Sequence, residues 1–327
     1  MPELPTFADL CDPACRSSLG LFGPKGTCWG LWGKDDEIGT LNLLTESHVK
    51  KAAACIRKGL VFPLSLPVDS PKPSFIGRPP VEHKMIPMLG HYAFDDQYDC
   101  FNPQGSSQWD GLRHMAFFSE EKFYNGIEPE EIAPGPHSTE RLGIHRMAQR
   151  GIVGRAVLLD YGRWAEKYRP EFDPLNRMEI TVDELDRVAA YQNVQFEQGD
   201  ILIVRTGWTK AHAKYQPQDI GKVINLLQPE TAGVKACKET YQWFWNHHFA
   251  AVISDNIAFE AYPVADWKDS CHAYFLAGWG MPIGELAYLE KLADNSDSDK
   301  VYEFFFTSTP INKEGGVSSP LNSICIK

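Results

Sequence analysis

Three short apolar runs in the second half of the chain restrict its fold more than any other feature. They cover residues 157–159, which close on Asp160, and residues 201–204 and 251–255. Runs of this length without polar interruption are typical of strands buried on both faces. A helix is expected over 180–190, because acidic residues come first there and apolar residues follow. Buried strands that alternate with helices predict an α/β fold.

Patterns nearer the N-terminus predict one more helix and one more strand. Residues 45–59 have the spacing of a helix, with Thr45 as its N-cap and Gly59 just beyond its end. Residues 60–66 have the composition of a strand, which should end before the proline-rich loop 71–80. A second set of strands is therefore expected in this part of the chain.

The two ends of the chain differ in regularity. Segment 1–33 is rich in Gly, Pro and Cys and is expected to be an irregular N-terminal arm. Residues 282–293 predict a helix that begins at Pro282 and carries Glu285 in its first turn. No shift in composition and no internal repeat divides residues 34–327, so we expect a single domain there.

Charge and composition exclude several classes of partner. The formal net charge is −11 and no Lys/Arg-rich run occurs, which argues against nucleic acid. No apolar stretch approaches the roughly 18 residues that span a bilayer, so we expect no membrane partner. The eight cysteines include no Cys-x-x-Cys pair and are expected to be reduced thiols. We expect a cytoplasmic protein that acts on a small molecule.

Two segments carry residues suited to metal or acid–base chemistry. Asp110 and His114 lie four residues apart, and a carboxylate with an imidazole can hold a divalent metal or act as an oriented base. His272 opens an apolar run, and Glu285 follows a glycine. Each pair alone also fits ordinary surface or core residues. Burial of such groups is costly without partners, however, and a metal would supply one.

Other residues could contact a ligand. The strand over 201–204 delivers Arg205 and Trp208 to its carboxyl end, a common place for ligand contacts, although Arg205 could equally pair with a nearby carboxylate. Arg78 and His83 lie at the end of the proline-rich loop and could line a pocket mouth. Motifs of zincins, α/β-hydrolases and P-loop enzymes are missing from the sequence.

Taken in order, several segments resemble the metal-dependent cyclase/hydrolase family that includes bacterial kynurenine formamidase, isatin hydrolase and trans-dienelactone hydrolase. The resemblance covers roughly residues 29–290. It rests on Trp32-Gly33 with 36–42, on Gln108-Trp109-Asp110 with His114, on 154–160, on 199–208, and on His272 and Glu285. It implies a swivelling β/β/α fold of mixed sheets with flanking helices. It also implies a homodimer or homotetramer with a metal in a pocket near a subunit boundary.

The resemblance implies a ligand set that this chain carries only in part. Asp110, His114, His272 and Glu285 match the family's ligands, whereas Gln104 and Gln108 stand where the formamidase members have histidines. A glutamine carbonyl is a harder and weaker ligand than imidazole. We expect one divalent metal, zinc or manganese, with Gln108 as a further possible ligand. The glutamines favour manganese or magnesium over zinc, or no metal at all.

These residues lead to the hypothesis of a hydrolase that attacks a cyclic amide, lactone or ester carbonyl of a small aromatic or natural-product substrate. His114 would be the base, and Asp110, His272 and Glu285 would hold the metal. Arg78 or Arg205 would bind a substrate carboxylate. The rings that would wall a flat substrate are those of Trp32, Trp109 and Trp208.

Two alternatives stay open. The first is a metal-free natural-product cyclase or isomerase that uses Asp110 and His114 for acid–base work. The second is a non-catalytic small-molecule binder, which the two glutamines would favour.

Overall fold

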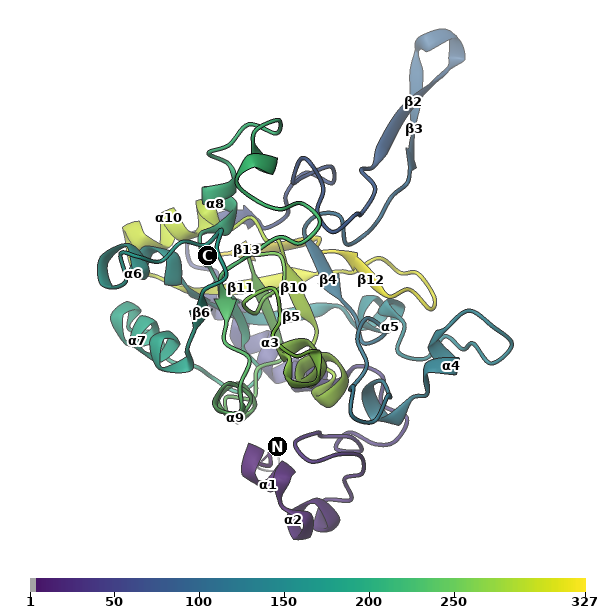
Figure 1. Cartoon of the computed structure of the whole chain (residues 1–327), viewed down its shortest axis with the longest axis vertical. Helices are drawn as coiled ribbons and strands as arrows, with labels where there is room; N and C mark the ends of the chain where they lie inside the picture. The colour runs from purple at the N-terminus through teal and green to yellow at the C-terminus, as the bar shows by residue number, and fades with distance from the viewer. Residues whose placement is uncertain (1–3) are drawn as a thin grey trace.

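A nine-stranded mixed sheet forms the centre of the molecule (Figure 1). The computed structural model describes residues 4–327. From one edge to the other, the strands are β1 (Val61–Pro63), β13 (Ser323–Ile326), β11 (Glu303–Ser308), β5 (Ile152–Leu159), β7 (Ile201–Val204), β9 (Ala251–Ser254), β10 (Ile283–Glu285), β4 (Gln108–Asp110) and β12 (Ser318–Pro320).

The middle of this sheet is parallel and almost completely buried. Strands β5, β7, β9 and β10 run parallel in that order, and every residue of β7 and β9 is buried. Antiparallel strands flank them on both sides. This arrangement confirms the three apolar runs as strands and confirms the mixed α/β fold with flanking helices.

Helices cover the sheet and extend around it. In Figure 1, α6 (Tyr161–Tyr168), α7 (Val182–Gln192) and α10 (Glu290–Asp299) lie at one side, and α4 (Pro129–Ile132) and α5 (Ile144–Arg150) lie at the other. The remaining helices are α1 (Phe7–Cys11), α2 (Pro13–Ser18), α3 (Glu46–Ala52), α8 (Trp208–His212) and α9 (Lys238–Asn246). Helix α7 begins two residues later than predicted because Thr181 and Glu184 form a capping box there.

The N-terminal segment is more regular than the sequence indicated. It contains α1 and α2, and the side chains of Phe7, Leu10 and Trp29 are part of the main hydrophobic core. The indole nitrogen of Trp29 donates a hydrogen bond to the carbonyl of Ala277, 2.6 Å away. This segment therefore packs against the chain that follows His272.

The predicted helix over 282–293 is wrong in its first half. Residues Ile283–Glu285 form strand β10 between β9 and β4, and α10 begins only at Glu290. Strands β9 and β4, on either side, provide backbone hydrogen-bond partners for these residues. These bonds outweigh the local helix signal of Pro282. Glu285 therefore projects from a sheet and not from the first turn of a helix.

The predicted helix over 45–59 and the strand over 60–66 are both shorter in the structure. Thr45 caps α3 as expected, but the helix tightens into a 3₁₀ turn at Ala53–Cys55. Gly59 does not end the helix, since its backbone N–H donates to the carbonyl of Lys327. Strand β1 keeps only three residues.

Two short ladders lie outside the main sheet. Strand β6 (Glu179–Ile180) pairs with β8 (Gly233–Val234). Strands β2 (Glu82–Met88) and β3 (Ala93–Asp99) form a hairpin that the sequence analysis did not predict, and that projects far from the body in Figure 1. None of the helices within residues 4–327 combines the length and the apolar character needed to cross a membrane.

A close contact between two glycines holds the segment after His272 in place. The backbone of Gly39 lies against Gly280, and a Cβ at position 39 would meet the Gly280 carbonyl oxygen at 2.2 Å. Thr40 adds backbone and side-chain hydrogen bonds to Gly280 and Ala250. This contact gives a physical reason for the Gly39-Thr40 pair in the sequence.

We predict that Gly39→Ala destabilises the protein by about 3 kcal/mol or more, because neither backbone can move aside. Gly59→Ala is the matched control, since Gly59 also has a positive φ but has nothing within 4 Å of its added Cβ. The control should lose only the roughly 1–2 kcal/mol of a left-handed residue. Urea denaturation of the two variants measures the difference, and equal losses would contradict the contact.

Candidate metal centre

The pairing of β4 with β10 places three polar side chains on one face of the sheet. Gln108 lies directly opposite Glu285, and Asp110 lies two residues further along β4. Alternate residues of a strand point to the same face, so Gln108, Asp110 and Glu285 share it. All three are buried. Trp109 points to the opposite face, where its indole nitrogen donates to the hydroxyl of Ser308.

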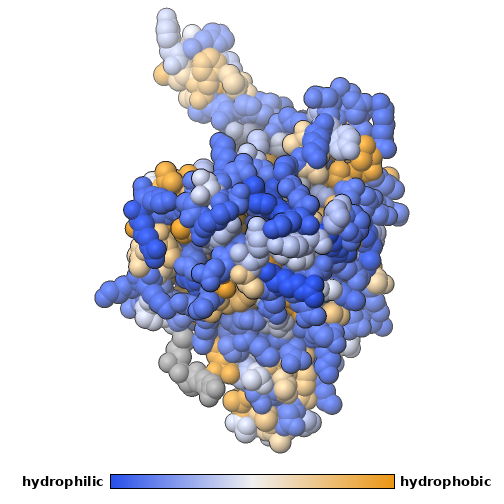
Figure 2. Space-filling view, turned by 90° about the vertical axis from the view of Figure 1, so that its left-hand side faces the viewer, coloured by the Kyte–Doolittle hydropathy of each residue, from blue (hydrophilic) through white to orange (hydrophobic). Residues whose placement is uncertain are grey.

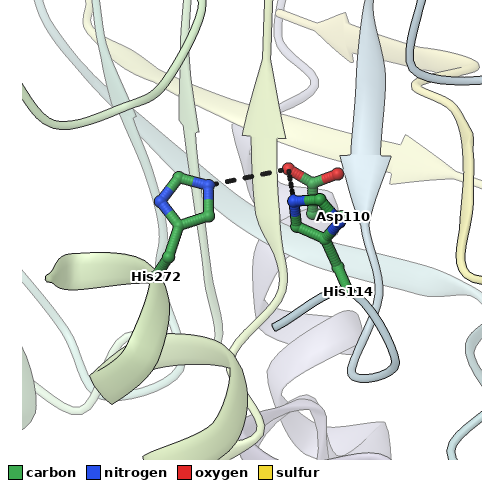
Figure 3. Close-up of side chains that lie close together, drawn as sticks. All are labelled: Asp110, His114 and His272. Carbon is green, nitrogen blue, oxygen red and sulfur yellow. Dashed lines mark ion pairs between the residues drawn. The ribbon is translucent and has the colours of Figure 1, made fainter. Parts of the chain in front are cut away.

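Two imidazoles reach the same place from other segments (Figure 3). His114 ends a tight turn after β4, in which the backbone N–H of His114 donates to the backbone carbonyl of Gly111. Its Nε2 lies 3.9 Å from Oδ2 of Asp110. His272 precedes the π-helix Ala273–Gly278, and its Nε2 lies 3.8 Å from Oδ2 of Asp110 and 3.2 Å from Oε1 of Glu285. The sequence-predicted residues Asp110, His114, His272 and Glu285 are thus brought together.

Glu260, which no sequence pattern indicated, contacts the Nδ1 side of the His272 ring. The Nδ1 atom of His272 lies 3.0 Å from Oε1 of Glu260, a carboxylate that is fully buried. A carboxylate at Nδ1 fixes the ring so that Nε2 faces Asp110 and Glu285. Glu260 lies twelve residues before His272 in an irregular stretch, where no local pattern distinguishes it.

The two glutamines and Arg78 surround the carboxylates. The amide nitrogen of Gln104 lies 2.7 Å from Oδ1 of Asp110, and that of Gln108 lies 2.8 Å from Oε2 of Glu285. The guanidinium of Arg78 donates to the backbone carbonyl of Gln104 and lies 3.4 Å from Oε1 of Gln108. A half-turn of either amide exchanges its nitrogen for its oxygen, so each glutamine can face an anion or a cation.

The charged groups of this cluster have strongly shifted pKa values. Burial would raise the pKa of Asp110, but the imidazoles of His114 and His272 outweigh burial and hold it below its usual range. Burial and the charge of Asp110 raise the pKa of Glu285 to about 7. Burial lowers the pKa of His114. Burial also opposes the charge on His272, but Glu260 and the other carboxylates raise its pKa well above the usual value.

The arrangement fits a divalent cation. One nitrogen or oxygen from each of Asp110, His114 and His272 lies within 4.8 Å of the other two. Oε1 of Glu285 is buried, and within residues 4–327 it makes no well-directed hydrogen bond, although Nε2 of His272 lies 3.2 Å away. Carboxylate oxygens with imidazole nitrogens are a common donor set for zinc and manganese. A cation would give Oε1 of Glu285 a further partner.

The remaining predicted site residues lie elsewhere. His83 is on the β2–β3 hairpin, where it pairs with Asp96. Arg205 is buried between Asp160 and Glu290, at 2.6 and 2.7 Å, so it has the carboxylate partners that were the alternative to a ligand. Three indole rings that were expected to wall a substrate lie in or against hydrophobic clusters instead: those of Trp32, Trp109 and Trp208. The structure does not bring them to the carboxylates and imidazoles.

A hollow of about 600 Å³ at the carboxyl ends of β5 and β7 is separate from this centre. It is lined by Thr206, Gly207 and cations that include Arg169 and Lys210. Both of these cations are paired with carboxylates of the chain. The hollow contains none of the converging carboxylates and imidazoles, so the chemistry is concentrated at β4 and β10.

Comparisons with known proteins show the family of this chain. Residues 62–261 match the family model named Cyclase. The crystal structure of a novel cyclase is 32% identical to this chain, with a TM-score of 0.80, and the match covers 92% of this chain and 99% of that one. Among the curated proteins, none matches the sequence.

Two more distant structures share the fold. Isatin hydrolase A from Labrenzia aggregata, bound to benzyl benzoate, is 12% identical with a TM-score of 0.58, over 84% of this chain and 94% of that one. Isatin hydrolase A from Ralstonia solanacearum is 16% identical with a TM-score of 0.57, over 85% of this chain and 94% of that one.

The raised pKa of Glu285 predicts a pH-dependent stability of the cation-free protein. The pKa of Glu285 is about 7 in the folded state and about 4.3 in the unfolded state. At a pH between these two values the folded state therefore binds more protons than the unfolded state. Stability should therefore fall as the pH rises through this window. His272 acts in the same direction, since its raised pKa adds stability that is lost as the pH rises.

Urea denaturation in chelator between pH 5 and pH 8 measures this effect. Glu285→Gln should remove up to about 3 kcal/mol of the wild-type loss across this range, because a neutral amide cannot ionise. An equal pH dependence in the variant would show that Glu285 does not titrate in this window.

Proposed function

This chain belongs to the cyclase family, and on that premise we propose that it is a metal-assisted hydrolase that opens a cyclic amide, lactone or ester. The observation that carries the proposal is the convergence of Asp110, Glu285 and His272 in one buried place, where Oε1 of Glu285 lies 3.2 Å from Nε2 of His272 without a well-directed hydrogen bond. His114 lies beside them and is the most exposed of the four side chains.

In this proposal Asp110, His272 and Glu285 hold one zinc or manganese ion, with Gln108 able to turn its carbonyl oxygen toward it. When bound, the cation would polarise the substrate carbonyl and acidify a water molecule. Glu260 keeps the imidazole of His272 oriented through Nδ1. Arg78, held at Gln104 and Gln108, supplies a fixed positive charge at the edge of the site.

His114 is the proposed proton acceptor. Its lowered pKa keeps the imidazole neutral near pH 7, so it can take a proton from a water molecule and return it to the leaving group. Asp110, 3.9 Å away, would stabilise the imidazolium that forms. Opening of the ring then yields a product with a new carboxylate, which Arg78 is suited to bind.

One observation supports a small ring as the substrate. Structural neighbours are named isatin hydrolases, and isatin contains a cyclic amide fused to a benzene ring. Isatin and simple lactones are therefore the first substrates to test.

A second candidate is a cyclase or isomerase that works without a metal. It is favoured by the amides of Gln104 and Gln108, which already donate to Asp110 and Glu285. Asp110 and His114 would then exchange protons with the substrate directly. Full activity in protein stripped of metal by a chelator would support this candidate over the hydrolase.

We predict that His114→Ala lowers kcat/KM for ring opening by about 10²–10⁴-fold, the usual contribution of a general base. The manganese content of this variant separates the two roles open to His114. An ion retained by Asp110, His272 and Glu285 is expected of a general base, and a lost ion would make His114 a ligand. His137→Ala is the matched control, since His137 is exposed in a loop and should behave as wild type. Turnover of the His114 variant close to wild type would remove His114 from the mechanism.

We also predict that Glu260→Gln weakens manganese binding about 10–100-fold, as is usual when the partner of a ligating imidazole is altered. Glu260→Asp, which keeps the charge, should recover part of that affinity. Calorimetric titration with manganese measures both. Unchanged affinity in Glu260→Gln would show that this carboxylate does not orient His272.

A further inference from the structure

The hollow at the carboxyl ends of β5 and β7 is a second place in the fold that suits a ligand. Its volume of about 600 Å³ lies within the range typical of small-molecule sites. The carboxyl ends of neighbouring parallel strands are also a common place for ligands in α/β proteins. Asp110, His114, His272 and Glu285 do not line it, so the chemistry of the metal centre does not account for this hollow.

Backbone atoms that are fixed by hydrogen bonds form part of the hollow. Thr206 and Gly207 follow β7, and their N–H groups donate to the buried carboxylate of Asp255 at 2.6 and 2.8 Å. Gly162 of α6 packs against this turn, since a Cβ there would meet the carbonyl oxygen of Thr206 at 2.6 Å. A Cβ at Gly207 would have only the guanidinium of Arg205 within 4 Å. The glycine therefore leaves space open above a fixed turn.

Two cations that line the hollow have donor atoms that the rest of the chain does not use. The Nε and Nη1 atoms of Arg169 lie 3.3 and 3.1 Å from the carboxylates of Glu171 and Glu184. Its Nη2 makes no hydrogen bond within residues 4–327. Lys214 forms neither an ion pair nor a hydrogen bond through Nζ with any residue of the same range. Both groups can therefore donate to a ligand.

The carboxylates that line the hollow already have partners. Glu166 pairs with Lys210 at 3.1 Å, and Glu171 pairs with Arg169. The carboxylate of Asp173 accepts hydrogen bonds within its own turn, at 2.9 and 2.7 Å. Because the acidic groups are satisfied and two of the basic groups keep unused donors, the hollow favours an anionic ligand.

Apolar side chains line the same hollow. The ring of Phe172 is held edge-on to Tyr161, with 4.9 Å between ring centroids, and Leu175 is buried. Tyr215 and Val223 are only partly covered, with 37% and 47% of their surfaces exposed. A ligand with an apolar ring would bury these surfaces, and an anionic group on it would reach the cations beside them.

The side of the molecule that carries α6 is mainly polar. Helix α6 lies at the side that faces the viewer in Figure 2, where hydrophilic side chains predominate. A protein partner is recognised by a larger surface with an apolar centre. A hollow in a polar surface instead fits a small molecule.

We propose that this hollow is a second binding site, which takes a small organic anion with an apolar ring. The carboxylate of the ligand accepts hydrogen bonds from Lys214 and from Nη2 of Arg169, and its ring packs against Phe172 and Leu175. This inference goes beyond the proposed function and does not rest on it, because no residue of the metal centre takes part.

Calorimetric titration of the full chain with phenylacetate tests the proposal. The wild type should bind phenylacetate with a Kd of about 1 mM or tighter. Acetate, which lacks the ring, and phenylacetamide, which lacks the charge, should each bind at least about 10-fold more weakly.

Two variants of the hollow should each weaken phenylacetate binding at least about 10-fold: Lys214→Glu, which repels the carboxylate, and Val223→Trp, which fills the space. Lys222→Glu is the matched control. Lys222 lies outside the hollow and pairs with Asp219, so this variant should bind phenylacetate as wild type does.

Arg78→Ala separates the hollow from the metal centre, because Arg78 is the cation that could bind a carboxylate there. Phenylacetate affinity should be unchanged in this variant. A loss of affinity in Arg78→Ala with none in Lys214→Glu would assign the ligand to the metal centre and overturn the proposal. A wild type that shows no saturable binding up to about 10 mM phenylacetate would overturn it as well.

Discussion

The rest of the site depends on the burial of two carboxylates on neighbouring strands. Asp110 on β4 and Glu285 on β10 share one face of the sheet, and a buried unpaired charge is among the most costly features a fold can contain. His272 approaches both carboxylates, the amide of Gln104 donates to Asp110, and the amide of Gln108 lies within reach of both. Oε1 of Glu285, 3.2 Å from Nε2 of His272, still has no well-directed hydrogen bond. A divalent cation is the simplest group that would neutralise the two buried carboxylates.

The scaffold explains why these groups can meet. Gly284 lies opposite Trp109 and has no side chain, since a Cβ there would approach Ile253 at 2.9 Å. The contact of Gly39 with Gly280 and the buried Trp29 hold the chain after His272 from the other side. Glu260 then sets the orientation of the ring. Gly39 and Trp29 come from segments far in sequence from His272, so the site is a product of tertiary packing.

The parts of the structure that local sequence patterns encode could be predicted. The apolar runs of β5, β7 and β9 predicted the middle of the sheet. The motifs that keep their order pointed to Asp110, His114, His272 and Glu285, and the structure brings these four side chains together. The prediction was wrong over 282–293, because the sheet neighbours of β10 outweigh the helix signal of Pro282. Glu260 could not be predicted, because only its tertiary contact with Nδ1 of His272, and no local pattern, distinguishes it. The hairpin of β2 and β3 was missed because Pro87 and several charges interrupt its alternation.

The most direct test of the central claim is the metal content of the full chain purified without chelator, compared with the near-isosteric variant Asp110→Asn. We expect about one zinc or manganese ion per chain in the wild type and a large loss in the variant, since the amide removes the anionic ligand that both imidazoles face. Wild-type protein that neither retains nor takes up a divalent cation when titrated would contradict the metal centre. It would turn attention to acid–base chemistry by Asp110 and His114.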